Sequence, residues 1–218
     1  MSINKLSLSL FFRSFLVRHY YLTVFQQRCR DFTPESHYVM LIQRQVMMSY
    51  VQIYTGDGKG KTTAAVGLAV RAAGAGKKVF FGQFLKKGDY SEIKGLGLLG
   101  EKKPFIQQFG SGRPVTEPLN EDDNIAAERG LTVVEAEMKS GKWDIMILDE
   151  FNIVAALGLV GRERLSDFID QRNIETELIL TGRDAPSWLM EKADLISEMK
   201  MHKHYFEQGV AARRGIEF

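Results

Sequence analysis

The feature that most constrains this chain is a glycine-rich segment that joins a short β-rich run to a helical run. Residues 51–55 read VQIYT, which predicts a strand, and residues 61–73 carry an apolar stripe with helical spacing. Residues 55–63 read TGDGKGKTT. This is close to the phosphate-binding consensus G-x-x-x-x-G-K-[ST], with Thr55 in place of the first glycine. A strand, this loop and a helix in that order predict a site for a nucleoside triphosphate.

The chemistry of a triphosphate accounts for the residue types in this loop. Glycines allow backbone amides to turn toward phosphate oxygens, and the start of the following helix adds its positive dipole. Lys61 supplies a point charge, and Thr62 offers a hydroxyl to Mg²⁺. The alternative is a glycine-rich turn without a ligand, but the strand and helix on either side favour the first interpretation. We expect the whole loop to bind the nucleotide: Thr55, Gly56, Asp57, Gly58, Lys59, Gly60, Lys61, Thr62 and Thr63.

From Tyr50 onward, short β-rich runs alternate with helical stretches. This pattern is typical of an α/β protein with a mostly parallel sheet and helices on both faces. A Gly- and Lys-rich stretch, 86–104, is expected to be a long loop that covers a ligand. The expected strands are 51–55, 78–84, 105–109, 143–149, 177–181 and 195–201, and the expected helices are 61–73, 121–140, 162–171 and 186–193.

Two carboxylates end the most apolar of these strands. The segment WDIMILD, residues 143–149, is apolar without alternation, which predicts a buried central strand of a parallel sheet. Asp149 and Glu150 then lie at the carboxyl edge, where the phosphate loop also lies. An acidic residue at this position often only caps the next helix. With the phosphate loop upstream, the better interpretation is that Thr62, Asp149 and Glu150 hold Mg²⁺, directly or through water.

Composition excludes several other classes of protein. The chain has 29 Lys and Arg against 27 Asp and Glu, and this net charge of +2 is too small for a dedicated nucleic-acid-binding protein. Its one cysteine, Cys29, excludes an internal disulfide and a CxxC pair, which favours a reducing, cytoplasmic location. No Ser or Cys nucleophile is paired with a His base. His202 and His204, two residues apart, would point the same way on a strand, but two ligands do not make a metal site, and a solvent-facing or hydrogen-bonding role is favoured.

Residues 1–48 differ in composition from the rest and are expected to form a basic N-terminal extension, with 49–218 as the main domain. The apolar run 6–12 ends at Arg13, far short of the ~20 residues that span a bilayer, so no membrane segment is expected. Three interpretations remain: a basic helix that covers a site or a partner subunit, an organelle transit segment, and upstream sequence translated from a misassigned start. Met47 and Met48, directly before the first strand, favour the last.

Five blocks of the chain together resemble a known family. They read TGDGKGKTTAAVGLAVRAAGAGKKV, QFLKKG, WDIMILDE, LILTGR and KHYFEQGVAARRGIEF. In this order they look like the ATP:corrinoid adenosyltransferases of the P-loop type, from about Val51 to Phe218. The resemblance implies a RecA-like P-loop fold, a homodimer and a flavoprotein reductant. It also implies transfer of the 5′-deoxyadenosyl group of ATP to a Co(I) corrinoid, with release of tripolyphosphate.

The implied reaction suits the residues present, because the nucleophile is the reduced cobalt itself and no protein base is needed. The enzyme must stabilise the departing triphosphate, present C5′ of the ribose and exclude water. The resemblance implies that the negative charge of the leaving triphosphate is neutralised by Lys59, by Lys61 and by a Mg²⁺ ion. Thr62 and Glu150 would bind this ion, and Asp149 would support it. The resemblance also implies that the nucleotide lies reversed in the loop. Four further residues match the family blocks and are expected near the nucleotide or the corrinoid: Gln83, Lys86, Arg183 and His204.

The chain departs from the family after Phe109-Gly110. Several relatives carry bulky aromatic residues here that displace the lower ligand of cobalt, whereas this chain has Ser111-Gly112-Arg113-Pro114. The range of corrinoids is therefore left open. Two alternatives to the adenosyltransferase also remain: a P-loop kinase or ATPase that transfers the terminal phosphoryl group, and a nucleotide-binding regulator that has lost its corrinoid contacts.

Overall fold

The computed structural model describes residues 49–112 and 117–218. The predicted extension 1–48 and the residues Arg113 and Pro114 lie outside the described residues. What is described belongs to one compact unit, Met48–Phe218. Its elements, in chain order, are β1 (Val51–Thr55), α3 (Lys61–Gly74), β2 (Val79–Phe84), α4 (Ser91–Gly97), η1 (Gly100–Lys102), β3 (Phe105–Phe109), α5 (Glu121–Lys139), β4 (Ile145–Asp149), α6 (Phe151–Ala156), α7 (Arg162–Asp170), β5 (Glu177–Thr181), α8 (Ser187–Met190), β6 (Leu195–Glu198) and η2 (Tyr205–Gln208).

The described strands form one six-stranded sheet in the order β3-β2-β4-β5-β1-β6, and every pairing is parallel. The apolar strand β4 lies between β2 and β5, as its lack of alternation predicted. Because β4 and β5 separate β1 from β2, the chain crosses over through α3 after the first strand. Since all strands run the same way, the loops after β1, β2, β4 and β5 meet at one edge of the sheet.

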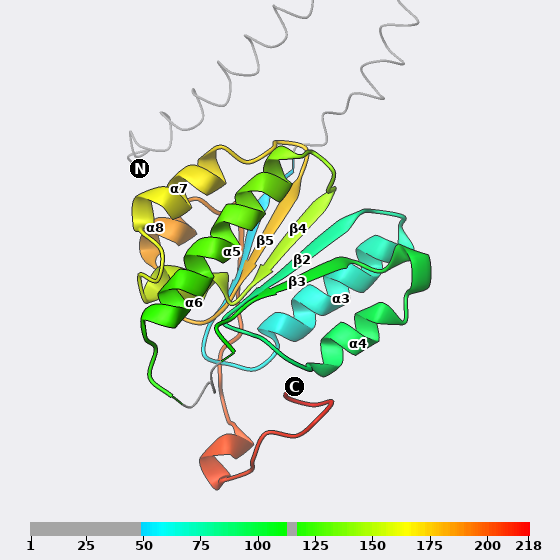
Figure 1. Cartoon of the computed structure of the whole chain (residues 1–218). Coiled ribbons are helices and arrows are strands. Elements are labelled where there is room, and N and C mark those ends of the chain that lie inside the picture. Colours follow the sequence, from blue (N-terminus) through cyan, green and yellow to red (C-terminus); the bar gives the residue numbers. More distant parts are fainter. Residues whose placement is uncertain (1–48, 113–116) are drawn as a thin grey trace, which may run out of the picture. The chain divides into compact units, whose positions relative to one another are not determined.

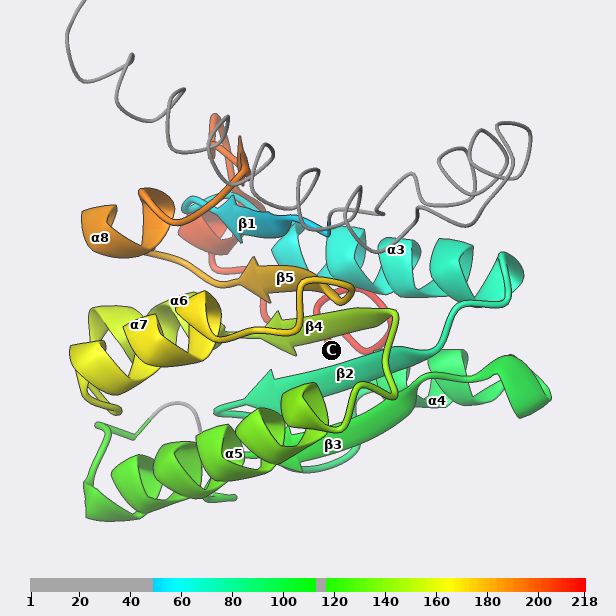
Figure 2. The same cartoon turned by 90° about the horizontal axis from the view of Figure 1, so that it is seen from above.

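Helices cover both faces of this sheet, which confirms the predicted α/β architecture. One core contains the buried faces of α5, α6 and α7, and the other contains those of α3 and α4. Figure 2 shows these two sets of helices on opposite sides of the strands. Alternate residues of β2 feed the two cores: Phe80 and Phe84 join the first, and Val79 and Phe81 join the second. Burying each of these phenylalanines contributes about 2 to 3 kcal/mol.

Local sequence explains how the two longest helices begin and how closely they pack. Asn120 and Asp123 form a capping box at the start of α5, which satisfies backbone donors that the helix itself leaves free. The buried face of α3 consists largely of alanine, at Ala65, Ala69 and Ala72, so this helix approaches the sheet closely. Among residues 49–112 and 117–218, no helix is both long and apolar enough to cross a membrane.

The stretch 86–104 is not the continuous loop that its glycines and lysines predicted. It contains α4 and η1, and Leu96 of α4 is buried against the core beneath α3. Helix α6 was not expected either, and α8 covers only Ser187–Met190 of the predicted 186–193. In these short helices, the burial of a few side chains outweighs weak helix propensity. Sequence patterns predict propensity but not which of these side chains will be buried.

The last strand is shorter than predicted, because β6 ends at Glu198. The amide of Met199 still donates to the carbonyl of Thr55, but the carbonyl of Met199 accepts from the amide of Gly58. The chain therefore leaves the sheet to run along the glycine-rich loop. His202 and His204 both lie beyond the strand, and the His204 side chain accepts a hydrogen bond at the start of η2.

Candidate functional site

Backbone strain marks the carboxyl edge of the sheet. In the described part of the chain, three residues other than glycine have a left-handed backbone: Leu85, Glu150 and Asp184, with φ of 57°, 60° and 55°. They follow strands β2, β4 and β5, so all three lie at this edge. A left-handed backbone is unfavourable for residues with a Cβ and is often retained where it serves function. This edge is thus the first candidate for the site.

The glycines of the loop are needed because another segment passes close to them. A Cβ on Gly56 or Gly58 would lie 2.5 or 2.6 Å from the carbonyl oxygen of Met199, closer than real Cβ atoms come. Gly60 precedes α3 with φ of 124°, a backbone that only glycine adopts readily. The loop is therefore fixed by glycine conformation and by the chain that follows β6.

Lys61 points into this loop. Its ammonium donates to the carbonyls of Gly56 and Gly58, each at 2.7 Å. Burial, and then the nearby Arg183 guanidinium, lower the pKa of Lys61 below its ordinary value. A buried cation whose partners are neutral carbonyls favours an incoming anion, which is the property required of a phosphate-binding lysine.

Asp149 is the centre of the polar interior at this edge and is fully buried. Its Oδ1 accepts hydrogen bonds from the hydroxyls of Thr62, at 2.8 Å, and Thr181, at 2.6 Å. Its Oδ2 accepts from Lys86, at 2.8 Å, and from Gln83, at 3.2 Å. Four segments distant in sequence are joined through one carboxylate. The structure thus joins Thr62 and Asp149, which the residues predicted, to Gln83 and Lys86, which the family resemblance implied.

Lys86 lies between two carboxylates, because its ammonium is also 3.4 Å from Glu92 of α4. Burial disfavours the charged form of Lys86, but the carboxylates of Asp149, Glu150 and Glu92 together outweigh this effect and raise the pKa of the lysine. Gln83 also donates to Glu92, at 3.0 Å, and accepts from Gln108 of β3, at 3.1 Å. Sequence reasoning missed Glu92 and Gln108. Glu92 lay in the stretch taken for a loop, and the alternation of β3 gave Gln108 no special signal.

Glu150 begins α6 in its strained conformation, and its backbone N–H donates to the Thr181 hydroxyl at 3.3 Å. Burial, and then the adjacent Asp149 carboxylate, raise the pKa of Glu150. A further cation beside this carboxylate would therefore be favoured. The Thr62 hydroxyl, which donates to the neighbouring Asp149, is the other ligand predicted for such a cation. The described residues contain no group of three or more His, Cys, Asp or Glu that could hold a metal. This arrangement suits Mg²⁺, which combines one or two carboxylates with phosphate oxygens and water.

Thr181 and Asn152 were also missed, although both connect strand ends at this edge. The Asn152 side chain donates to the carbonyls of Tyr54, at 3.1 Å, and Gly182, at 3.0 Å. It thereby ties the ends of β1 and β5 together beneath the phosphate loop. In the sequence, Asn152 follows the acidic pair within an apolar stretch, which does not distinguish it from an ordinary residue. Thr181 lies in the family block LILTGR, from which only Arg183 was expected at the site.

The remaining loop residues and two further predicted residues, Arg183 and His204, are not among the described side chains that donate to Asp149. The Thr55 hydroxyl accepts from the amide of Ala185, and the Asp57 carboxylate accepts from the amide of Met201. Thr63 and Arg183 are exposed. His204 accepts from the amide of Phe206 and caps η2. Lys59 turns toward the C-terminal segment, where its ammonium bonds Glu217 at 2.7 Å.

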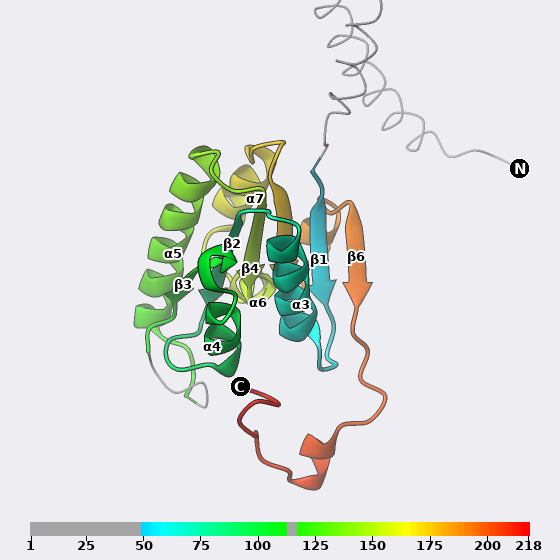
Figure 3. The same ribbon diagram turned by 90° about the vertical axis from the view of Figure 1, so that its right-hand side faces the viewer.

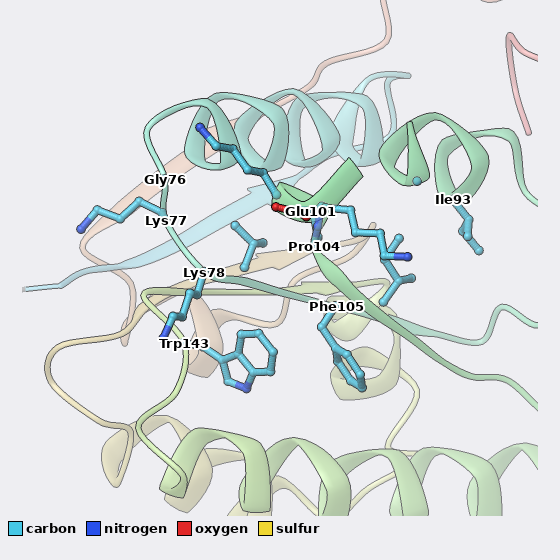
Figure 4. A pocket seen from close by; sticks show the side chains of 13 residues that line it. Gly76, Lys77, Lys78, Ile93, Glu101, Pro104, Phe105 and Trp143 are labelled. Atoms are coloured by element: carbon cyan, nitrogen blue, oxygen red, sulfur yellow. The ribbon is translucent and has the colours of Figure 1, made fainter. Parts of the chain in front are cut away.

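A large hollow in the described surface lies elsewhere. It measures about 730 Å³ and opens where β2, β3 and β4 begin, at the amino edge of the sheet (Figure 4). Its lining includes Lys77, Lys78, Phe105 and Trp143. None of the predicted nucleotide-binding residues lines it. We place the candidate site at the carboxyl edge, because the buried charges, the strained residues and the glycine loop converge there.

The fold and this edge define a P-loop nucleotide-binding protein: a parallel sheet with a glycine-rich loop between β1 and α3, joined by a threonine hydroxyl to an acidic strand end. Comparison with known proteins narrows the class. Residues 47–218 match the model of the family described as ATP:corrinoid adenosyltransferase BtuR/CobO/CobP. The chain belongs to this family.

Individual relatives agree with the family match. The chain is 31% identical over 194 residues to the corrinoid adenosyltransferase of Escherichia coli K12, covering 89% of this chain and 97% of that protein. It is 31% identical over 175 residues to the corrinoid adenosyltransferase of Pseudomonas aeruginosa, covering 76% and 82%. An uncharacterized protein of Nostoc sp. is 34% identical over 187 residues, and the match spans about half of that protein's length.

Proposed function

We propose that this chain binds ATP at the carboxyl edge of its sheet and transfers the 5′-deoxyadenosyl group to the Co(I) of a corrinoid, with release of tripolyphosphate. Corrinoid adenosyl transfer, in the synthesis of cobalamin cofactors, is the activity of the family to which the chain belongs. The hydrogen bond from Thr62 to Asp149 carries the proposal for the site, because it joins the phosphate loop to the acidic end of β4.

The reaction needs a group that accepts negative charge on the leaving triphosphate. Cobalt donates its electron pair to C5′, the bond from C5′ to oxygen breaks, and that bond's pair leaves with tripolyphosphate. Lys61 and the amides of the loop are placed to stabilise this charge. Thr62 and Glu150 would hold Mg²⁺, with Asp149 orienting the threonine; when bound, Mg²⁺ neutralises charge on the phosphate oxygens. Lys61, Thr62 and Glu150 are therefore the proposed catalytic residues.

Positioning is the second requirement, since a carbon and a metal must approach in line with little water between them. Gln83 and Lys86 form the wall of the site on the β2 side, where their contacts with Asp149 and Glu92 hold them rigidly. Arg183, exposed beside β5, is placed to contact ATP or a corrinoid side chain. His204, with its ring 4.7 Å from that of Tyr205, contributes to the C-terminal side of the site.

Product analysis tests the proposal against its competitors. Purified protein, ATP, Mg²⁺ and chemically reduced corrinoid should yield an alkyl-cobalt product, identified by its light-sensitive spectrum. Tripolyphosphate should form in an equal molar amount. ADP and phosphate in their place would favour a P-loop kinase or ATPase. Binding of corrinoid without any product would favour a regulator that has lost catalysis.

The segment after Gly110, which departs from the family pattern, is expected to affect which corrinoids the enzyme accepts as substrates. Ser111 donates to Asp123 in the first turn of α5, at 2.7 Å, and Gly112 follows it with φ of 90°. Neither residue offers the bulk needed to press beneath a corrin ring. We therefore propose that corrinoids lacking a lower ligand react at least as well as those carrying one. Parallel rates with cobinamide and cobalamin test this.

The protein's surroundings are proposed by analogy with the family. We propose a cytoplasmic homodimer that receives Co(I) corrinoid from a flavoprotein reductant, with no nucleic-acid or membrane partner. The proposed catalytic domain is 49–218, with 1–48 as an extension. The alignment with the E. coli protein covers more of this chain than residues 47–218, so it reaches into that extension. Turnover retained after deletion of residues 1–47 supports the boundary; turnover lost in a folded product gives the extension a role at the site.

A further inference from the structure

A C-terminal strap, residues 199–218, crosses the carboxyl edge of the sheet. Figure 3 shows it leaving β6, passing beyond the strand ends and finishing beside α4. The strap starts along the phosphate loop, where the carbonyl of Met199 accepts from Gly58 at 2.7 Å. The amide of Met201 donates to Asp57 at 2.9 Å. These contacts fix the inner end of the strap.

The strap returns to the loop at Lys59. The ammonium of this lysine donates to the Glu217 carboxylate at 2.7 Å, to the carbonyl of Ile216 at 2.6 Å and to the Tyr205 hydroxyl at 3.2 Å. An ammonium has three N–H donors, and all three are directed at the strap. Lys59 is also one of the residues predicted to bind phosphate, and in the structure its ammonium anchors the strap.

Glu217 is itself held from the other side. Its carboxylate accepts from the backbone N–H of Arg213 at 2.7 Å, from the Arg213 guanidinium and from the Tyr205 hydroxyl. These neighbours, Arg213 first, lower the pKa of Glu217, so it is ionised at neutral pH. Its side chain is only 18% exposed, whereas most of the strap is open to solvent.

The far end of the strap reaches α4. The terminal Phe218 oxygen accepts from the Ser91 hydroxyl at 2.8 Å, and α4 also carries Glu92, which contacts Gln83 and Lys86. The strap thus spans from the phosphate loop to the helix that flanks the Asp149 cluster. Few apolar contacts hold it, since Phe206 is 73% exposed and Ile216 54%. Polar contacts at Lys59 and Ser91 are what keep it in place.

We infer that Glu217 is a positioning residue of the nucleotide site: through Lys59 it holds the outer side of the phosphate loop in the conformation that accepts ATP. This inference rests on the proposed nucleotide site. An exposed ion pair alone contributes little to folding. Its effect on the loop between Gly56 and Gly60 is larger, because glycine-rich backbone is free to adopt other conformations when the Lys59 side chain is released. Asp57 is then the side chain of this segment that still binds the strap. Loss of Glu217 should therefore weaken ATP binding and leave the chemical step unchanged.

The test compares Glu217→Gln with Glu207→Gln, a matched exchange on the same strap at an exposed carboxylate. ATP affinity is measured by calorimetry with Mg²⁺, and KM and kcat are measured by alkyl-cobalt formation. We expect Glu217→Gln to raise Kd and KM for ATP about five- to tenfold, with kcat within about twofold of the parent. Glu207→Gln should leave all three unchanged, and Glu217→Asp should restore part of the affinity.

A double-mutant cycle with Lys59→Met separates positioning from a general loss of structure. If Glu217 acts through Lys59, the double variant should bind ATP no more weakly than Lys59→Met alone. Independent, multiplying effects would overturn the inference, as would a Glu217→Gln variant that binds ATP like Glu207→Gln or loses kcat with KM unchanged. Calorimetry reads ATP binding whichever bond is later broken. Failure of adenosyl transfer would therefore not be mistaken for failure of the positioning role.

Discussion

The two edges of the sheet differ in buried charge and in backbone strain, and this difference distinguishes the candidate site from the hollow at the other edge. The strand arrows in Figure 1 point toward the carboxyl edge. There, Asp149 is fully buried among four hydrogen-bond donors, and three residues with a Cβ have a left-handed backbone. The amino edge has a hollow of about 730 Å³, yet its lysines lie at the rim and none of those strained residues is near it. Volume alone does not indicate function. Buried charge and backbone strain are costly to stability and persist where they serve a purpose.

The largest expected effect comes from the loop lysine. Replacing Lys61 with alanine removes a buried positive charge beside the phosphates, and kcat should fall roughly 10² to 10³-fold, as for other lost electrostatic contacts. Lys78→Ala, at the amino edge, is the matched control and should leave kcat unchanged. Steady-state rates of alkyl-cobalt formation measure both. Equal losses at the two edges would remove the distinction between them.

The second effect is on stability. Lys86→Met removes the cation beside the buried Asp149 carboxylate and leaves its other hydrogen bonds in place. We expect the free energy of unfolding to fall by about 3 kcal/mol. This corresponds to a melting temperature lower by roughly 10 °C in a chain of this size. Lys102→Met, at the amino-edge hollow, should change the melting temperature by at most about 1 °C. Thermal unfolding followed by circular dichroism gives both values, and an unchanged melting temperature for Lys86→Met would show that Asp149 does not depend on this ion pair.

A smaller effect of opposite sign is expected at Glu150. Its raised pKa means that the folded protein retains this proton to higher pH than the unfolded chain does, so ionisation lowers stability as the pH rises through the folded pKa. Glu150→Gln should therefore stabilise the protein by about 1 kcal/mol near pH 8, while abolishing most turnover. The gain should vanish near about pH 4, where both side chains are neutral. Melting curves in metal-free buffer test this; destabilisation at pH 8 would mean that the carboxylate is already compensated.

The smallest expected effect belongs to the amino-edge hollow itself. Replacing Lys77, Lys102 and Lys103 together with serine changes an exposed rim, and both KM for ATP and kcat should stay within about twofold of the parent. Kinetics at low and at physiological salt check this. A tenfold rise in KM would make this hollow part of substrate binding and would overturn the contrast between the edges.

Much of this site was predictable because it depends on local patterns. The glycine loop, the apolar run that ends in Asp149 and the helix after the loop each have a sequence signature, and together they placed Thr62 and Asp149 at one edge. The alternation of strands and helices likewise predicted the parallel sheet. Gln83 and Lys86 were expected only from the family blocks, and the structure places both against Asp149.

What was missed depends on contacts between residues distant in sequence. Asn152 has no distinguishing pattern, and Thr181 was covered by the family block LILTGR without being expected at the site. Glu92 lay in a glycine-rich stretch whose helix forms because Leu96 is buried. The link from Lys59 to Glu217 joins residues 158 positions apart and has no periodicity to reveal it. The strain at Glu150 is likewise a property of the folded backbone alone.

An isotope label in ATP shows which bond of the nucleotide the enzyme breaks. ATP labelled with ¹⁸O in the bridge between C5′ and the α-phosphorus is incubated with protein, Mg²⁺ and reduced corrinoid, and the phosphate products are analysed by mass spectrometry. If the carboxyl edge presents carbon to cobalt, all of the label will be found in tripolyphosphate. Label retained in ADP, with unlabelled phosphate released, would contradict the account, because the enzyme would then be cleaving its nucleotide at phosphorus.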